Sequence, residues 1–325
     1  MAPAFLPIER VRNLSEQDFE AVISEDRPII IEDVVSQWKA FDAWTPDYLV
    51  QRIGHVRIPI RASSSHIHPD LHDLHDQRDR SLVLVMLARI AQHIFGRHRD
   101  NRIEMTFADF VALLTGSAEG FRYMAGAEEL RIIHEGQWNE SLAGLRPDFA
   151  IPEYVAQPSL DSAALWLSAK GVRSHLHYDG NSLLNLNAQV AGSKHVQLYS
   201  PTQVGNLYPY LLTNGHPHTF SRVNVEKVDP EEFPLFSQLQ GYEETLKAGD
   251  LLFIPAYWYH SFKHLGDFNI NLNFWWRAEF VRLTPVSARD YLGQLIFGLA
   301  STAKIPPFWL IGWLRKIERH IIRAP

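Results

Sequence analysis

The sequence predicts a mainly β domain, folded as a sandwich or barrel, with helices flanking it on both sides. From residue 163 onward the hydrophobic pattern changes to a period of two, in short segments rich in β-forming residues. Gly, Pro and Asn turns separate these segments. We expect strands in ALWLSA, SHLHYD, LNLNAQV, KHVQLYS, TLKAGDLLFIP and FNINLNFWW.

Length and composition set the domain organisation and the kind of site. The chain has 325 residues, of which 46% are hydrophobic and 21% are charged. At this length a single core no longer grows comfortably, so we expect one large domain over residues 1–284 and a helical segment over residues 285–325. The absence of cysteine excludes a disulfide scaffold, a thiolate zinc site and a cysteine nucleophile. Any metal must therefore be held by histidine and carboxylate side chains.

Charge and the two ends of the sequence indicate location and partners. A formal net charge of -6 gives no general attraction for nucleic acids. The start of the chain lacks the basic stretch and apolar run of a secretory signal, so we expect a cytoplasmic protein. Lys304 and the pair Pro306-Pro307 divide the apolar tail into pieces too short to cross a hydrocarbon core of about 30 Å. We expect amphipathic helices there, packed against the core or against a second subunit, and the latter arrangement would make a homodimer.

The N-terminal half mixes helical signals with one short buried strand. NLSEQDFEAVI and TFADFVALLTG have the caps and spacing of helices, and RPIIIEDV is typical of a strand. Between them, within residues 61–115, a polar loop precedes a further helix. No regular pattern brings the histidines of this loop together, so we interpret them as exposed residues rather than metal ligands. They are His66, His68, His72 and His75.

Two predicted strands carry rows of amide side chains. In LNLNAQV, the residues Asn185, Asn187 and Gln189 share one face. FNINLNFWW repeats this pattern with three asparagines at positions 269–273, followed by Trp275. Asparagine is a poor strand former, and solvent-facing strands more often carry Lys, Glu and Thr. The rows favour a polar cavity inside the sheet structure, and the alternative is an exposed sheet face.

A candidate metal site combines the segment SHLHYD with a distant histidine. His177 and Asp179 lie two residues apart, so a strand would present both side chains on one face. His260 follows the turn and strand GDLLFIP and is available as a third ligand. Two histidines and one carboxylate form the facial triad of non-haem iron(II) oxygenases, which leaves coordination positions open for a co-substrate and oxygen. His175 would share this face, and we interpret it as a supporting or core histidine rather than a ligand.

Several motifs in order resemble one known family. HYDGNSLLNLNAQVAGSKHVQLYSP is followed by LYPY, GYEETLKAGDLLFIPAYWYH and NLNFWW. This order resembles the JmjC-type, cupin-like oxygenases, and among them most the asparaginyl hydroxylases that act on hypoxia-inducible factor. The resemblance extends over about residues 120–277, with a looser likeness in RPIIIEDVVSQW and in the tail. It implies a double-stranded β-helix, or jelly roll, that uses Fe(II), 2-oxoglutarate and O2.

The resemblance also implies roles for individual residues. It implies that His177, Asp179 and His260 bind iron, and that Lys194 pairs with the distal carboxylate of 2-oxoglutarate. A lysine suits this task because its ammonium group can neutralise a buried carboxylate, although without the metal motif Lys194 would be an ordinary turn residue. The other implied co-substrate contacts, each of which could instead be barrel packing, are Tyr123 and Ser174 through their hydroxyl groups, Asn185 and Asn273 through their amides, and Trp275 as an aromatic wall.

One departure from the family pattern concerns the substrate. The asparaginyl hydroxylases hold their target amide with an Arg-Gln pair, but the matching position here is Thr219-Phe220. The His-rich insertion at residues 61–100 is expected to border the mouth of the cavity. Because loops on a rigid scaffold set substrate choice, these changes indicate a target other than asparagine.

The sequence therefore predicts a 2-oxoglutarate- and Fe(II)-dependent dioxygenase that hydroxylates a C–H bond and releases succinate and CO2. A protein or peptide side chain is the first predicted substrate, with a small metabolite or a tRNA base as alternatives. Lysine demethylation is a further alternative, although the chain lacks the cysteine-bearing zinc module that accompanies many demethylases. A non-catalytic binding module and a zinc hydrolase are both disfavoured by the presence of Lys194 beside the metal motif.

Overall fold

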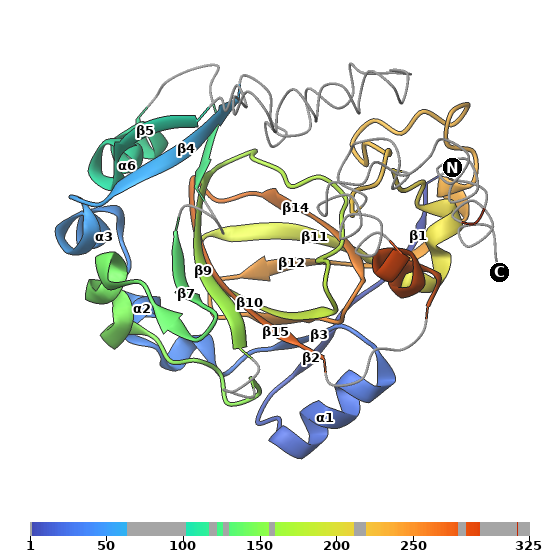
Figure 1. The fold of residues 1–325 in the computed structure, drawn as a ribbon, viewed down its shortest axis with the longest axis horizontal. Helices are drawn as coiled ribbons and strands as arrows, with labels where there is room; N and C mark the ends of the chain where they lie inside the picture. Colours follow the sequence, from blue (N-terminus) through green and yellow to red (C-terminus); the bar gives the residue numbers. More distant parts are fainter. Residues whose placement is uncertain are drawn as a thin grey trace, which may run out of the picture.

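A computed structural model describes residues 2–63, 102–116, 122–125, 130–155, 160–210, 219–278, 284–292 and 317. The strands form two sheets that face each other, and helices cover the outer side of the larger sheet (Figure 1). The predicted mainly β fold with flanking helices is confirmed, and the arrangement is consistent with a jelly roll. The boundary between residues 284 and 285 stays a prediction, as does the helical tail, of which only residues 285–292 and 317 are described.

The smaller sheet has the strand order β1 (Ala4–Leu6), β12 (Gln240–Lys247), β11 (Ser193–Tyr199) and β14 (Tyr259–His264). Within the described residues the larger sheet runs in the order β2 (Glu9–Val11), β3 (Ile29–Ile31), β13 (Leu251–Ile254), β10 (Leu183–Ala191), β15 (Phe268–Arg277), β9 (Leu160–Ala169), β6 (Arg122–Ala125), β4 (Arg57–Ser63) and β5 (Arg102–Thr106). A short hairpin of β7 (Arg131–His134) and β8 (Gln137–Trp138) attaches to β9.

The N-terminal strands connect the two sheets. β1 pairs in parallel with β12 of the smaller sheet, and β2 pairs in parallel with β3 of the larger one. Ile8, between β1 and β2, is buried in the hydrophobic cluster between the sheets. Arg10 on β2 donates two hydrogen bonds to the carboxylate of Asp250, at 2.9 and 3.1 Å. The first eleven residues therefore connect the two sheets, and they are bonded to the turn that precedes β13.

The helices begin where the sequence provides caps. They are α1 (Glu16–Glu25), α2 (Lys39–Ala43), α3 (Pro46–Ile53) and α6 (Phe107–Thr115), with 3-10 turns η1 (Val35–Gln37), η3 (Glu140–Asp148), η5 (Pro201–Asn206) and η7 (Phe236–Gln238). The side chains of Ser15, Thr45 and Thr106 accept hydrogen bonds from backbone N–H groups in the first turns of α1, α3 and α6. This confirms the two helices predicted in NLSEQDFEAVI and TFADFVALLTG.

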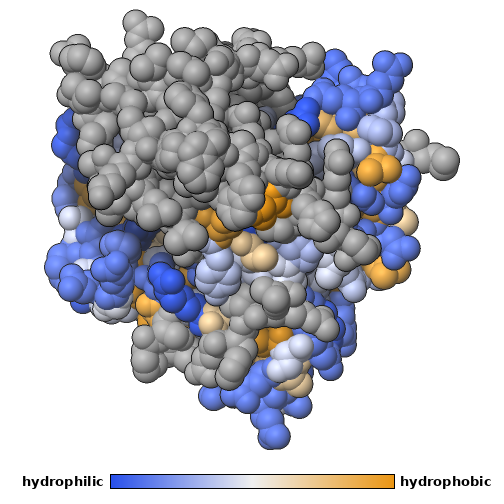
Figure 2. Space-filling view, turned by 45° about the vertical axis from the view of Figure 1, so that its right-hand side comes forward, coloured by the Kyte–Doolittle hydropathy of each residue, from blue (hydrophilic) through white to orange (hydrophobic). Residues whose placement is uncertain are grey.

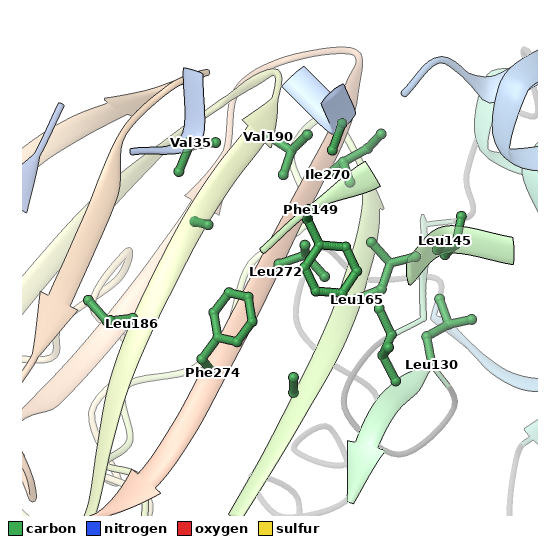
Figure 3. Packing of buried hydrophobic residues seen from close by; sticks show 14 of the residues in the cluster. Val35, Leu130, Leu145, Phe149, Leu165, Leu186, Val190, Ile270, Leu272 and Phe274 are labelled. Carbon is green, nitrogen blue, oxygen red and sulfur yellow. The ribbon is translucent and has the colours of Figure 1, made fainter. Parts of the chain in front are cut away.

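The main hydrophobic core lies between the larger sheet and the helices. Figure 3 shows Leu186 on β10 and Leu272 and Phe274 on β15 in this core, with Phe149 packed beside them. The ring centroids of Phe149 and Phe274 are 6.1 Å apart. These residues alternate with the amide rows on β10 and β15, so the amides must point to the opposite face of the sheet.

That opposite face of the larger sheet points toward the smaller sheet, and the interior between the two sheets has an apolar part and a polar part. In the apolar part, Ile30 and Leu252 of the larger sheet pack with Val196 and Leu198 of the smaller one. The other part holds the amide rows, whose six members are 0–4% exposed: Asn185, Asn187, Gln189, Asn269, Asn271 and Asn273. The rows therefore line a buried polar interior, and the alternative of an exposed sheet face is wrong.

The segment that contains His177 and Asp179 is not a regular strand. SHLHYD was expected to be a regular strand, but residues 173–179 form only isolated β-bridges, with Lys263 and His260 on one side and Phe220 on the other. This segment lies between β14 and the chain around residue 220, and it bends into a turn at residues 180–182. The His-rich loop and the helix predicted after it lie outside the described residues.

The described surface is mostly polar. Figure 2 shows hydrophilic residues over the outer parts of one face, with smaller hydrophobic patches between them. The large hydrophobic residues that are exposed include Leu6, Leu235 and Tyr291. Among the described helices, none has the length and apolarity that a membrane crossing requires.

Candidate metal centre

Three side chains predicted as metal ligands converge at one place between the sheets. His177 and Asp179 come from the segment before β10, and His260 comes from β14. One ligand atom from each lies within 4.8 Å of the other two. The backbones of His177 and His260 are paired by two hydrogen bonds, at 3.0 and 2.6 Å, and this pairing fixes the separation of the two imidazoles.

Each imidazole is oriented by a backbone carbonyl. Nδ1 of His177 lies 2.7 Å from the carbonyl oxygen of His175, and Nδ1 of His260 lies 3.0 Å from that of Trp258. With a proton on each Nδ1 these contacts are hydrogen bonds, which leaves Nε2 of each ring as the nitrogen that can bind a metal. Both Nε2 atoms are 3.9 Å from the same carboxylate oxygen, Oδ1 of Asp179. Two imidazole nitrogens and one carboxylate oxygen thus face a common point.

The second oxygen of Asp179 is held by the amide row and by Trp275. Oδ2 accepts hydrogen bonds from Nδ2 of Asn185 and Nε1 of Trp275, each at 2.9 Å. Asn185 is itself held, because its Oδ1 accepts from Asn273 at 3.1 Å, and Asn273 accepts from Asn271 at 2.5 Å. This chain of amides leaves Oδ1 of Asp179 as the oxygen directed at the histidines.

Burial and neighbouring charges shift the pKa values of Asp179 and His260. Burial alone would raise the pKa of Asp179, but His260, His177 and the two N–H donors outweigh it and hold that pKa below its ordinary value. Burial lowers the pKa of His260 to about 4. An ionised carboxylate and a neutral imidazole are the forms that bind divalent metals.

Lys194 lies in the same interior without a carboxylate partner among the described residues. Its side chain is 1% exposed, and Nζ donates to Oδ1 of Asn187 at 2.6 Å. Nζ also lies 4.4 Å from the centre of the Phe262 ring, two residues after His260 on β14. Burial lowers the pKa of Lys194 well below its ordinary value. Among the described residues this buried amine contacts an amide oxygen and a ring, which suits an anion as a further partner.

Other buried polar atoms in this interior lack a hydrogen-bond partner within the described part of the chain. Oε1 of Gln189 and Nε1 of Trp166 flank Asn271 in the register of β10, β15 and β9. Nδ1 of His264, opposite Lys194 on β14, is a third. Burial and the charge of Lys194 lower the pKa of His264 to about 3. The indole N–H of Trp166 is a donor and, together with Lys194, fits a polar, anionic ligand such as 2-oxoglutarate, and the donor set of the triad fits iron(II).

The remaining predicted site residues are placed as follows. Ser174 is next to Phe262 and accepts a hydrogen bond from its backbone N–H at 2.8 Å, which leaves the hydroxyl hydrogen free to donate elsewhere. Tyr123 is on β6, and its side chain lies outside the described residues. His175 is 6% exposed, and its Nε2 lies 2.8 Å from the carbonyl oxygen of Ser221, so it stands apart from the converging group.

Contacts that the sequence did not indicate concern Asn185, Asn273 and Trp275. Their expected contact with the co-substrate stays a prediction. In the structure Asn185 and Trp275 hold Asp179, and Asn273 holds Asn185. Phe220, known from the sequence only as a departure from the family pattern, stacks on the ring of His177 with centroids 5.2 Å apart. An apolar ring thus covers one side of the candidate metal centre.

Comparison with known proteins agrees with this geometry. The model of the cupin-like domain family matches residues 15–282. The chain is 28% identical over 289 residues to lysine-specific demethylase JMJ31 of Arabidopsis thaliana, which covers 86% of this chain and 51% of that protein. It is 26% identical over 255 residues to lysine-specific demethylase 8 of Xenopus tropicalis, covering 77% of this chain and 48% of the relative. The chain thus spans about half the length of these relatives.

A further relative matches over almost its whole length. The human tRNA wybutosine-synthesizing protein 5 is 26% identical over 342 aligned positions, which cover 99% of this chain and 97% of that protein. The similarity to asparaginyl hydroxylases stays a prediction. The match over residues 15–282, together with the two facing sheets and the His-Asp-His group between them, shows that the chain belongs to the cupin-like domain family.

Proposed function

We propose that the protein is a 2-oxoglutarate- and Fe(II)-dependent dioxygenase that hydroxylates a C–H bond. The observation that carries this proposal is the occurrence, in one interior, of the triad His177, Asp179 and His260 and of the buried Lys194. A zinc hydrolase would use the triad but would have no use for a buried lysine without a carboxylate partner. A non-catalytic binding module would need neither group.

The residues of the chain have separable tasks in this proposal. His177, Asp179 and His260 would hold iron(II), which when bound supplies the oxidising chemistry with O2. Lys194 would neutralise the distal carboxylate of 2-oxoglutarate, and Asn185 and Trp275 would keep Asp179 in place. The overall reaction converts 2-oxoglutarate, O2 and a C–H group into succinate, CO2 and a C–OH group. The buried amides and aromatic rings would exclude water from the reacting groups.

The first substrate proposed is a side chain of a protein or peptide. The relatives named lysine-specific demethylases support it, since lysine is a protein side chain. The stacking of Phe220 on His177 places an apolar wall beside the metal, which suits an aliphatic C–H group. The net charge of -6 also favours a protein over a polyanion.

A tRNA base is the second candidate substrate. The match over nearly the whole chain is to a tRNA wybutosine-synthesizing protein, whereas the demethylases are matched over about half their length. Any residues that would contact RNA in the insertion 61–100 lie outside the described part of the chain.

Anaerobic titration of the protein with iron(II) and 2-oxoglutarate tests the reaction class. A charge-transfer absorption band is expected when both are bound, and His177→Ala should abolish the band and the turnover of 2-oxoglutarate while the protein stays folded. Absence of the band in folded, metal-loaded protein, or unchanged turnover in the variant, would contradict the proposal.

Mass spectrometry then separates the substrate classes. A gain of 16 Da that depends on added 2-oxoglutarate should occur in lysate proteins or peptides for the first candidate. The same gain in nucleosides from digested tRNA would select the second. Loss of 14 Da from methylated lysine peptides would instead indicate demethylation.

A further inference from the structure

The loop that follows Asp179 has an unusual backbone for ordinary residues. Asn181 and Ser182 both have φ of 60°, in the left-handed region that side chains other than glycine rarely adopt. Tyr257, three residues before His260, has φ of 66°. Such residues keep this conformation only where surrounding contacts determine it. Both segments that carry candidate metal ligands are therefore fixed by groups outside themselves.

One side chain contacts both segments. Asp290, in the helical residues 285–292, is 2% exposed. Its Oδ2 accepts a hydrogen bond from the backbone N–H of Asn181 at 3.1 Å and lies 3.4 Å from the hydroxyl of Tyr257. The Tyr257 hydroxyl is also 2.9 Å from Oγ of Ser182, so carboxylate, phenol and serine form a connected group.

The helix that carries Asp290 is itself anchored beside the site. Arg289 is fully buried and donates a hydrogen bond to the carbonyl oxygen of Tyr210. Val286 is buried in a hydrophobic cluster with Tyr178, Tyr257 and Tyr259. Tyr178 lies between His177 and Asp179 in the sequence, and Tyr259 directly precedes His260. The position of Asp290 is thus coupled to the segments that hold the ligands.

We propose that Asp290 is a positioning residue for the metal centre: its carboxylate ties the loop after Asp179 to the turn before His260, so that the C-terminal helix sets the separation of the ligands. This inference rests on the proposed metal-dependent function. It assigns to residues 285–292 a task in metal binding in addition to packing.

Metal affinity of the folded full-length chain tests the inference. Manganese(II) is the probe, and free metal is followed by its electron paramagnetic resonance signal in a titration of metal-free protein. Asp290→Ala should weaken manganese binding by about 10- to 100-fold, the range found for groups that orient metal ligands. Asp290→Asn can keep an oxygen in the position of Oδ2, where it still accepts from Asn181 and from the Tyr257 hydroxyl, so this variant should stay within about threefold of the unchanged protein.

Asp33 provides a matched control. Its Oδ2 accepts from the backbone N–H of Asn13 at 2.7 Å, and Asn13 also has a left-handed φ, of 51°. Asp33→Ala removes the same kind of contact between two segments that carry no candidate ligand, and it should leave the manganese affinity unchanged. The inference would be overturned if Asp33→Ala and Asp290→Ala lost manganese affinity equally, or if Asp290→Ala kept the affinity of the unchanged protein.

A milder variant covers the case in which Asp290→Ala does not fold. Tyr257→Phe removes only the hydroxyl that joins Asp290 to Ser182, and it should weaken manganese binding severalfold with near-ultraviolet circular dichroism unchanged. Unchanged binding in this variant would also overturn the inference. A failure of the proposed function is distinguishable, because the unchanged protein would then bind manganese without turning over 2-oxoglutarate.

Discussion

At Lys194, burial and charge oppose each other. The ammonium group is removed from water, and the described residues offer it an amide oxygen and an aromatic ring but no carboxylate. An anion bound at Nζ would supply the missing charge. The cost of burying this lysine is then recovered only in the complex, which makes the residue a determinant of binding rather than of folding.

Lys194→Met should therefore weaken 2-oxoglutarate binding to the metal-loaded protein by at least about 30-fold, because truncating one partner of a buried charge pair costs 2 kcal/mol or more. Isothermal titration calorimetry measures this loss. Lys170→Met is the control, since Lys170 is exposed and its ion-pair partner among the described residues is the exposed Asp267. Equal affinity in Lys194→Met and the unchanged protein would contradict the role of Lys194.

Because of Lys194, we expect the binding of 2-oxoglutarate to depend on pH. The pKa of this lysine is depressed in the free protein, and a bound carboxylate would raise that pKa, so between the two values the complex holds more protons than the free protein. Binding should take up protons in this window, and affinity should fall as pH rises through it. Calorimetry in buffers of different ionisation enthalpy measures the uptake, which should disappear in Lys194→Met.

Trp275 gives a second prediction at the residue scale. Trp275→Phe removes one of the two N–H donors to Oδ2 of Asp179 and should weaken manganese binding by about tenfold or more. Trp166→Phe is a matched control, because its indole N–H has no partner among the described residues. Similar affinities in the two variants would show that the hydrogen bond to Asp179 does not matter.

At the scale of elements, a buried carboxylate joins the helices α2 and α3 to the 3-10 turn η3. Asp148, at the end of η3, accepts hydrogen bonds from Lys39 on α2, Trp44 between α2 and α3, and Tyr48 on α3, at 2.7 to 3.0 Å. Burial alone would raise the pKa of Asp148, but these three donors outweigh it and hold the pKa below its ordinary value. The helices are thus fixed to one another through a single side chain.

Asp148→Ala should lower the free energy of unfolding by about 1–3 kcal/mol, because Trp44 and Tyr48 lose their acceptor. In the unchanged protein this contribution is present above the unfolded pKa of about 3.9 and is lost as pH falls through the lower folded value. Urea unfolding at neutral and acidic pH measures both effects. Asp267→Ala, at a 94% exposed side chain, should change stability by less than about 0.5 kcal/mol.

Sequence periodicity predicted the elements better than their contacts. A period of two on β10 and β15 was enough to place the amides on one face, since strand geometry is local. Periodicity did not predict the segment around His177 correctly, because its backbone makes only isolated bridges to β14 and to Phe220 and is not part of a continuous strand. The contact of Asp290 with Asn181 joins residues 109 apart, and nothing local in the sequence indicates it.

For the molecule as a whole, metal binding and stability should be linked. The candidate ligands come from two segments that meet only in the folded chain, so the unfolded chain offers no comparable site. Manganese at 100 times its dissociation constant should raise the free energy of unfolding by about 2.7 kcal/mol. Thermal unfolding with and without metal measures this gain, and His177→Ala should show none. A chelator that leaves the melting temperature unchanged would contradict the site.

The N-terminal strands have a consequence for biosynthesis. Arg10 and Asp250, which pair through two hydrogen bonds, are 240 residues apart in the sequence. At a synthesis rate of 5–20 residues per second, β2 waits roughly 10–50 s on the ribosome before its partner exists. During this time neither sheet can close, and the apolar residues Ile8 and Ile30 lack the members of their cluster that follow residue 250, which are Leu252, Ile254 and Trp258. Nascent chains stalled before residue 250 should therefore be the ones that engage chaperones most strongly.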